Sequence, residues 1–271
     1  MSIPILPDPD DVDLAQQHAM DRNADALRAM PAAVRDECLM RIVRDDDIGT
    51  ASYLVGLGAR INRHTLRVAA TLIDSDMFEA LLTLQTQSSE VLNEMMIFAS
   101  VESLTRPFRI LMATGKCDIH AASDSVLRCA ARYGSIDILR EVVAMRINLD
   151  VQDCAAIRGA AVRRCVESVK ILADAGASIN HERLEHDVFA PVRIAALQGD
   201  IRMVRMLIEQ GAHLHLPNLT FCAVLGNSAD AVMALIEAGS PSTDACVALA
   251  EERGYDRDII DAICRSVHVT G

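Results

Sequence analysis

The chain has 271 residues, of which 51% are hydrophobic, 24% are charged and 3% are aromatic, and it contains no Trp. An apolar half made almost entirely of Ala, Leu, Ile, Val and Met favours closely packed helices, so we expect an all-α fold. The formal net charge of −12 leaves no excess of cations to neutralise a phosphate backbone or an anionic bilayer. We therefore expect no nucleic acid and no membrane as partners.

The N-terminal stretch differs in character from the rest of the chain. Residues 1–11 are acidic, are interrupted by prolines and lack the basic region of a signal peptide, so we expect a flexible acidic tail there and one domain over residues 12–271. Residues 13–30 outline a helix pair. Residues 45–47, three aspartates, are expected to form a turn between two helices, because a calcium loop also needs alternating oxygen ligands, a central Gly and a closing Glu.

Four segments of the chain share one pattern, an amphipathic helix that ends at a glycine. In residues 201–215, for example, apolar side chains recur at three- and four-residue steps, and Gly211 follows them. A glycine in this position can take the left-handed conformation that ends a helix. The other three copies are residues 49–62 with Gly58, 166–180 with Gly176 and 229–243 with Gly239.

A shorter, alanine-rich helix is predicted upstream of these helices, most clearly in residues 190–200 and 125–135. Pro191 suits a first helical turn, where its missing N–H is no loss, and paired alanines let adjacent helices approach closely. Residues 244–267 carry the last helix pair, with Gly254 at its turn.

The segment Ala190-Pro191-Val192-Arg193-Ile194-Ala195-Ala196 resembles the T-P-L-H-x-A signature of the ankyrin-repeat family, although its Thr and His are absent. The residues that close successive units recur about every 30 positions, close to the family period of about 33, and residues 183–184 look inserted. These closing residues are Asn62, His120, Asp150, Asn180, His215 and Thr243. The resemblance implies an all-α ankyrin-repeat solenoid of about eight or nine helix pairs, including terminal caps, with short β-hairpin connectors. A TPR or HEAT solenoid is the alternative, but its period would be longer.

The cysteines and histidines give no sign of a metal or cofactor site. Eight cysteines occur without a CxxC pair, so we expect reduced, structural thiols and a cytoplasmic location. His213 and His215 fall in a connector without an acidic or thiol ligand at a suitable spacing, so we interpret them as exposed turn residues. We expect no cofactor and no metal.

The chain also lacks the sequence signatures of common enzyme classes. It contains no GxGxxG, GxxxxGK[ST], GxSxG or HExxH motif. A repeat scaffold of this length leaves no room for a separate catalytic domain. We therefore expect a protein without enzymatic activity.

The resemblance implies a concave face, made by the first helices and the connectors, as the surface that binds a partner. On this basis the exposed ends of the first helices supply Arg44, Asp45, Arg132, Tyr133, Val162, Arg163, Leu197 and Gln198. The connector side supplies Asp124, Gln152, Cys154, His186, Asp187 and Phe189. Arg and Tyr are the residue types that dominate binding energy at protein interfaces.

These observations lead to three hypotheses about function. The first is a monomeric, cytoplasmic adaptor or scaffold that binds a protein partner through the concave face. The second is an inhibitor or immunity-type protein that neutralises a basic enzyme or toxin, its acidic charge speeding the encounter. The third is a host-directed effector, which the sequence alone does not separate from the first.

Overall fold

The computed structural model describes residues 7–73, 75–180 and 190–267, and within these ranges it contains eighteen helices and no β-strand. The chain divides into two compact units, Met1–Ile119 and His120–Gly271. The division into two units does not test the expectation of one domain over residues 12–271, which stays a prediction.

The helices of each unit form consecutive pairs, because every odd-numbered helix contacts the even-numbered helix that follows it. The first unit contains α1 (Pro9–Met20), α2 (Ala24–Ala29), α3 (Ala32–Arg44), α4 (Ile48–Gly56), α5 (Arg63–Thr71), α6 (Met77–Leu84), α7 (Ser89–Val101) and α8 (Thr105–Ala113). The second unit contains α9 (Ala121–Tyr133), α10 (Ile136–Ala144), α11 (Val151–Val162), α12 (Val166–Asp174), α13 (Pro191–Leu197), α14 (Ile201–Glu209), α15 (Leu219–Leu225), α16 (Ala229–Glu237), α17 (Asp244–Glu252) and α18 (Arg257–Val267).

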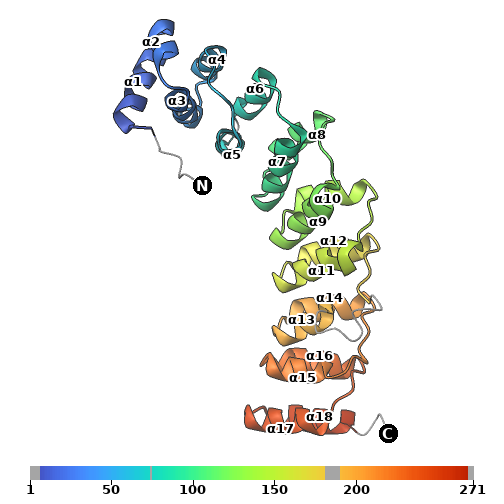
Figure 1. Ribbon diagram of the computed structural model, residues 1–271. Coiled ribbons are helices and arrows are strands. Elements are labelled where there is room, and N and C mark those ends of the chain that lie inside the picture. Colours follow the sequence, from blue (N-terminus) through green and yellow to red (C-terminus); the bar gives the residue numbers. More distant parts are fainter. Residues whose placement is uncertain (1–6, 74, 181–189, 268–271) are drawn as a thin grey trace. The chain divides into compact units, whose positions relative to one another are not determined.

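In the second unit the helices form two layers (Figure 1). The odd-numbered helices from α9 to α17 contact one another in succession, and the even-numbered helices from α10 to α18 do the same. We call the odd-numbered helices the first helices and the even-numbered ones the second helices of their pairs. Each pair thus packs on its neighbours, as a repeat array requires.

Small side chains allow the first helices of the second unit to pack closely. The paired alanines of α9, α11 and α13 are fully buried: Ala130, Ala131, Ala160, Ala161, Ala195 and Ala196. Gly226, at the end of α15, lies so close to α13 that a Cβ there would meet the Ala196 carbonyl oxygen and come within 2.8 Å of the Leu197 carbonyl oxygen. The predicted role of paired alanines is therefore confirmed at this junction.

The glycines that were predicted to end the second helices have the expected backbone. Gly58, Gly176 and Gly239 have φ values of 92°, and Gly211 has a φ of 80°. In each case the chain leaves the helix through the left-handed region, which a residue with a Cβ enters at a cost.

Side-chain hydrogen bonds join successive connectors in the second unit. The carboxylate of Asp150 accepts a 2.8 Å bond from the backbone N–H of Ser178. The Asn180 side chain accepts one from the N–H of His213 at 2.8 Å and donates one to the carbonyl of Gly211 at 2.8 Å. The expected hairpin connectors are thus turns without paired strands in the described ranges, because side chains take the place of a strand ladder.

The first helix begins earlier than the predicted tail boundary at residue 11. α1 starts at Pro9, and the Asp8 carboxylate caps it by accepting a 3.0 Å bond from the N–H of Asp10. Proline suits the first helical position, and the acidic Asp10 and Asp11 are stabilised by the positive end of the helix dipole. The same acidic composition that indicated a tail therefore supports the first turn of a helix.

Three further predicted elements agree with the structure. α1 and α2 form the helix pair expected over residues 13–30, and α17 and α18 form the last pair. Asp45 ends α3, and Asp47 caps α4 through its side chain, so the aspartate triplet is a turn between helices.

Candidate protein-binding surface

The C-terminal ends of the first helices in the second unit have the same backbone. Each is followed by a left-handed residue, with φ values of 72° at Gly134, 59° at Arg164 and 64° at Gly199. Counting back from these residues gives equivalent positions in successive repeats. Arg132, Val162 and Leu197 occupy one position, and Tyr133, Arg163 and Gln198 occupy the next.

Two of the predicted partner-binding residues contact each other across neighbouring repeats. The guanidinium carbon of Arg163 lies 5.6 Å from the ring centroid of Tyr133, within the range of a cation–π interaction. Both side chains are exposed, Tyr133 by 44%. The pair is therefore held in place before any partner arrives and still presents an aromatic face and a cation to solvent.

Gln198 joins the ends of α11 and α13. Its side-chain amide donates a 2.9 Å hydrogen bond to the backbone carbonyl of Val162. The backbone carbonyl of Gln198 accepts a 2.9 Å bond from the Arg164 guanidinium. Leu197, beside it, is 52% exposed. Gln198 thus positions the surface, while Leu197 offers it an apolar contact.

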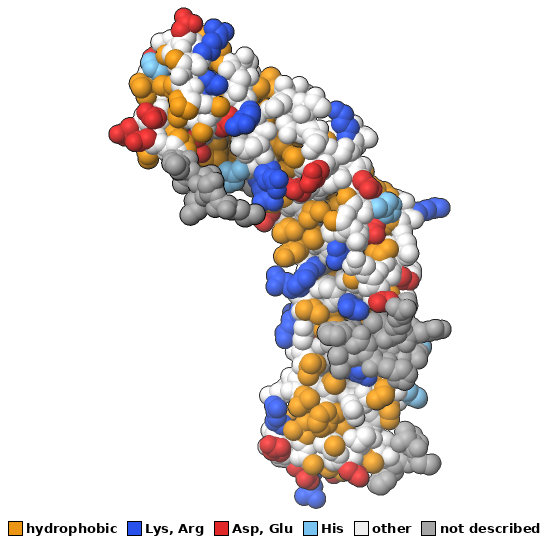
Figure 2. Space-filling model, viewed as in Figure 1, with side chains coloured by type: hydrophobic (Ala, Val, Ile, Leu, Met, Phe, Trp, Pro, Cys, Tyr) orange, Lys and Arg blue, Asp and Glu red, His pale blue; other side chains and the backbone are white. Residues whose placement is uncertain are grey.

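A groove of about 300 Å³ lies between α9 and α11. We call it the arginine groove, and it is lined by Arg128, Arg132, Ala155, Arg158, Gly159 and Val162. Figure 2 shows Lys and Arg side chains gathered along the edge of the second unit where these helices lie. The aliphatic stem of Arg132 crosses Gly159, whose absent side chain would otherwise stand 3.6 Å from the Arg132 Cβ.

Arg128 and Arg158 belong to this groove, although they were not among the predicted site residues. The signal was present in the sequence as an Arg-x-Ala-Ala pattern, which occurs at Arg67, Arg128, Arg158 and Arg193. The alanines of the pattern are buried, so the arginine has a fixed position relative to the helix packing. Arg193 is itself buried and donates a 2.8 Å bond to the carbonyl of Pro217.

α9 and α11 both begin, at their connector ends, with a backbone conformation that is unusual for a helix. Residues 122–124 and 152–154 each have φ values between 52° and 60°, a turn of left-handed conformation. Arg128 donates to the carbonyl of Ser123 at 3.1 Å, and Arg158 donates to the carbonyl of Asp153 at 3.3 Å. The arginine at the same position in both repeats therefore donates a hydrogen bond to a backbone carbonyl of the first turn.

Three predicted residues, Asp124, Gln152 and Cys154, lie in these left-handed turns, but Cys154 is fully buried, so its side chain does not face a partner. The Asp124 carboxylate is within 2.6 Å of Nδ1 of His120 and is largely covered. Gln152 is exposed. They are thus at the opposite end of the first helices from Tyr133 and Arg163.

The remaining predicted residues are not part of this surface as described. Arg44 and Asp45 are exposed at the end of α3 in the first unit, where the Asp45 carboxylate accepts a 3.1 Å hydrogen bond from Gln16. His186, Asp187 and Phe189 lie outside the described residues.

All eight cysteines carry free thiols, and three of them are buried. Burial raises the pKa of Cys38 to about 11 and that of Cys154 to about 12, the latter helped by the neighbouring Asp150 carboxylate. Desolvation also raises the pKa of Cys129, against the opposing effect of Arg128 and Arg132. Because the thiolate is the reactive form, these thiols are poor nucleophiles near neutral pH.

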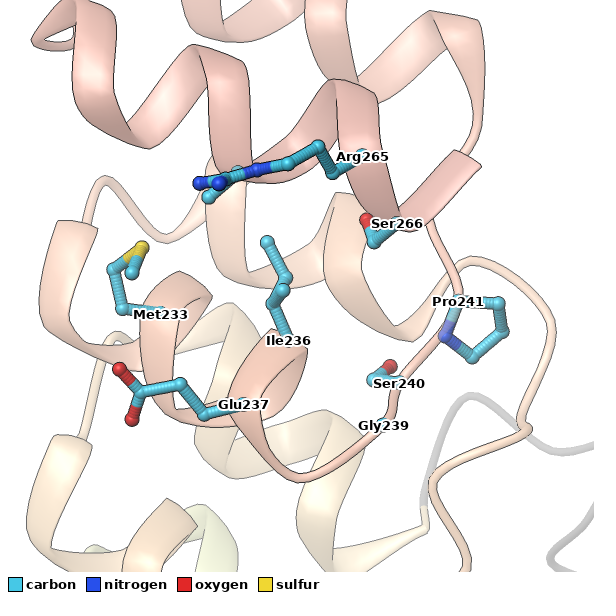
Figure 3. Close-up of a pocket in the computed structure, with 9 residues that line it drawn as sticks. Met233, Ile236, Glu237, Gly239, Ser240, Pro241, Arg265 and Ser266 are labelled. Atoms are coloured by element: carbon cyan, nitrogen blue, oxygen red, sulfur yellow. The ribbon is translucent and has the colours of Figure 1, made fainter. Parts of the chain in front are cut away.

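A second cleft, of about 420 Å³, lies between α16 and α18 (Figure 3). Met233 and Ile236 give it apolar walls, and the Arg265 side chain extends over it, with Nε donating to the Asp261 carbonyl at 3.3 Å. It belongs to the second helices, so it is separate from the predicted surface.

A metal site needs grouped ligands, and a membrane span needs a long apolar helix; the described part of the chain has neither. No three His, Cys, Asp or Glu side chains there are grouped so that they could hold a metal ion. None of its helices combines the length and the hydrophobicity needed to cross a bilayer.

Comparison with known proteins identifies the fold. No family model matches the sequence, and no curated protein matches it. Among solved structures, the chain is similar to the human ASB11 ankyrin repeat domain, with a TM-score of 0.58 and 19% sequence identity. The match covers 76% of this chain and 99% of that domain. The likeness confirms the predicted all-helical ankyrin-repeat architecture.

Proposed function

We propose that this chain, which has the ankyrin-repeat fold, is a non-catalytic adaptor or scaffold that binds a protein partner through the first helices of its second unit. Ankyrin-repeat folds are generally protein–protein interaction modules and are typically non-catalytic. The face made by first helices is the usual recognition surface of such stacks. The ends of the first helices in the second unit supply exposed Tyr and Arg side chains, which contribute most to affinity at protein interfaces.

One observation carries the proposal: the exposed pair of Tyr133 and Arg163, with Leu197 exposed on the next repeat. Tyr and Arg are the residue types that dominate binding energy at interfaces, and Leu197 adds an apolar contact beside them. Their backbone positions are held by buried alanines and by the Gln198 hydrogen bonds, so binding would cost little ordering entropy.

The experiment uses a partner recovered by pull-down and identified by mass spectrometry, with affinity measured by calorimetry. Replacing Arg132, Tyr133 and Arg163 by Ala together is expected to weaken the complex by more than about 2 kcal/mol and to leave folding intact, because all three side chains are on the surface.

The matched control removes the same number of cations from a second helix. Arg202 and Arg205 are exposed on α14, and replacing both by Ala is expected to leave the affinity unchanged. If the triple variant binds normally and the control variant does not, the outer helices are the recognition surface and the proposal is wrong.

The monomeric state and the cytoplasmic location stay predictions. Sedimentation velocity of the full chain measures the first, and imaging of a tagged chain in its native cell measures the second. The inhibitor hypothesis differs from the adaptor hypothesis in that binding suppresses the partner's activity, so an activity assay of the recovered partner separates these two. The effector hypothesis requires the recovered partner to be a protein of a host.

A further inference from the structure

The C-terminal parts of α9 and α11 carry a positive charge that the net charge of the chain conceals. Residues 125–135 contain two arginines, residues 154–165 contain three, and neither stretch contains an Asp or Glu. The whole chain, by contrast, has a net charge of −12. The part of the face that α9 and α11 form is thus opposite in sign to the protein as a whole.

Within the described residues, three arginines of this face lack the carboxylate partners that some cations of the second helices have. On the second helices, Arg140 pairs with Glu167 at 3.0 Å and Lys170 pairs with Asp174 at 3.0 Å. Within the described ranges, Arg132, Arg163 and Arg164 form no ion pair with a carboxylate. Their charge is therefore not neutralised by neighbouring acidic groups.

Apolar side chains follow the same face from repeat to repeat. Val162, Leu197 and Leu225 occupy one equivalent position at the ends of α11, α13 and α15, and they are 45%, 52% and 39% exposed. We call these three residues the apolar row. Arg132 holds the same position on α9, beside the exposed ring of Tyr133.

We propose, building on the function proposed above, that this face binds an extended acidic segment of a protein partner, with apolar side chains on the apolar row and carboxylates at the arginines. A guanidinium presents a planar set of donors that matches a carboxylate. An RNA strand would offer the same kind of charge, but it has no aliphatic side chains to place on Val162, Leu197 and Leu225, and Tyr133 is the one aromatic ring among the described residues named on this face, so the apolar row suits a peptide.

The geometry of the fold sets the spacing of the segment. Packed helices lie about 8–10 Å apart, and an extended chain advances about 3.3 Å per residue, so apolar residues about three positions apart would follow successive repeats. Four repeats then correspond to a segment of about twelve residues.

The test uses the full chain and a synthetic peptide of about twelve residues, with Leu at every third position and Glu elsewhere, in fluorescence anisotropy. A second peptide carries Lys in place of Glu, and a third carries Ser in place of Leu. The first peptide is expected to bind about tenfold more tightly than either, and to weaken as salt is raised from about 0.05 M to about 0.5 M.

Matched protein variants assign the binding to this face. Replacing Arg132 and Arg163 by Gln is expected to reduce affinity for the acidic peptide about tenfold, whereas replacing Arg202 and Arg205 by Gln leaves it unchanged. Thermal unfolding followed by circular dichroism verifies that both variants fold. Equal or tighter binding of the Lys peptide, tighter binding of a single-stranded RNA of similar length, or an equal loss in both variants would overturn the inference.

The natural partner separates this inference from the proposed function. If its affinity depends on Arg132, Tyr133 and Arg163 but crosslinking places a basic segment on them, the inference fails and the proposed function stands. If its affinity does not depend on them, the proposed function fails with it.

Discussion

Several first helices of the two units end with the same backbone but carry different chemistry there. In the first unit α3 and α7 are followed by left-handed residues, Asp46 and Ser103, just as α9 and α11 are followed by Gly134 and Arg164 in the second. The residues before them include Asp45 and Glu102 in the first unit, whereas the second unit has Tyr133 and Arg163 there.

The acidic residues of the first unit are used inside the unit. The Asp45 carboxylate accepts a hydrogen bond from Gln16, and Asp46 accepts one of 2.5 Å from Ser75. The aromatic–cation pair of the second unit bridges two repeats and faces solvent. The repeat therefore fixes the position of these side chains, and the residue type at that position decides whether it contributes to stability or to binding.

The junctions that α9, α11 and α13 make also differ from the one that α7 makes. In the second unit the alanine pairs of α9, α11 and α13 are fully buried, and Gly226 contacts the backbone of α13. In the first unit the buried face of α7 includes Met95 and Met96. Flexible methionine side chains can move to fill gaps, whereas alanine and glycine have no flexible side chain that could adjust to a change at the junction.

The largest loss of stability is expected from a side chain added at Gly226, where α15 packs closely on α13. Gly226→Ala adds a Cβ that would collide with the Ala196 carbonyl oxygen and lie 2.9 Å from the backbone nitrogen of Gly199, so the backbones must move apart. We expect a loss of about 1–3 kcal/mol in the free energy of unfolding, measured by urea denaturation.

Gly56→Ala in the first unit is the matched control. Nothing lies within 4 Å of a Cβ at Gly56, the last residue of α4. Alanine is favoured over glycine in a helix, so this variant is expected to be unchanged or more stable by up to about 1 kcal/mol. A Gly226→Ala protein as stable as the Gly56→Ala protein would show that the α13–α15 junction can open at no cost.

The next effect compares equivalent helix caps in the two units. Asp47 caps α4 by accepting from the Thr50 N–H at 2.9 Å and from the Thr50 hydroxyl at 2.5 Å, whereas Asp200 caps α14 through the Met203 N–H alone, at 3.1 Å. Each change to Ala is expected to cost about 0.5–2 kcal/mol, with Asp47→Ala at the upper end because it loses two bonds.

The pH dependence of stability provides a second measure of the Asp47 cap. The hydrogen bond from the Thr50 side chain, followed by that from its backbone, lowers the pKa of Asp47. A lowered pKa stabilises the fold above the unfolded pKa, and this contribution is lost as the pH falls through the folded value. The difference in stability between wild type and Asp47→Ala should therefore shrink in acid, and a constant difference would contradict the cap.

Much of the fold could be predicted because its signals are local. A glycine that ends an amphipathic helix and a pair of alanines upstream are visible as sequence patterns, and Gly211 and Ala196 behave as those patterns require. The start of α1 could not be placed, because Asp8 and Pro9 read equally well as a tail and as a helix cap.

The site was predicted less completely, for a different physical reason. Exposed helix ends such as Tyr133 and Arg163 follow from the repeat register, but the groove is formed by Arg132 of α9 packing beside Gly159 of the neighbouring helix α11. The hydrogen bonds of Gln198 likewise join residues 36 positions apart, at Val162. Such contacts depend on packing between repeats and not on a pattern within one.

The smallest expected effect concerns the aromatic–cation pair itself and its counterpart in the first unit. Arg163 lies 5.6 Å from the Tyr133 ring centroid, and Arg22 lies 4.7 Å from that of Tyr53. A double-mutant cycle with Ala at both positions should give a coupling of about 0.5–1 kcal/mol for each pair in urea denaturation.

The first-unit pair is expected to have the larger coupling energy, for two reasons. The Arg22–Tyr53 distance is shorter, and the Tyr53 hydroxyl also donates a 2.8 Å hydrogen bond to the Arg22 carbonyl, which keeps the ring in place. Tyr133 is exposed and depends on Arg163 for its contact with the next repeat. A weak coupling there leaves both side chains available to a partner, since little internal energy is lost when they turn toward it. A larger coupling at Tyr133 than at Tyr53 would instead assign the second-unit pair to stability, and would remove the distinction between the two units on which the proposed binding surface depends.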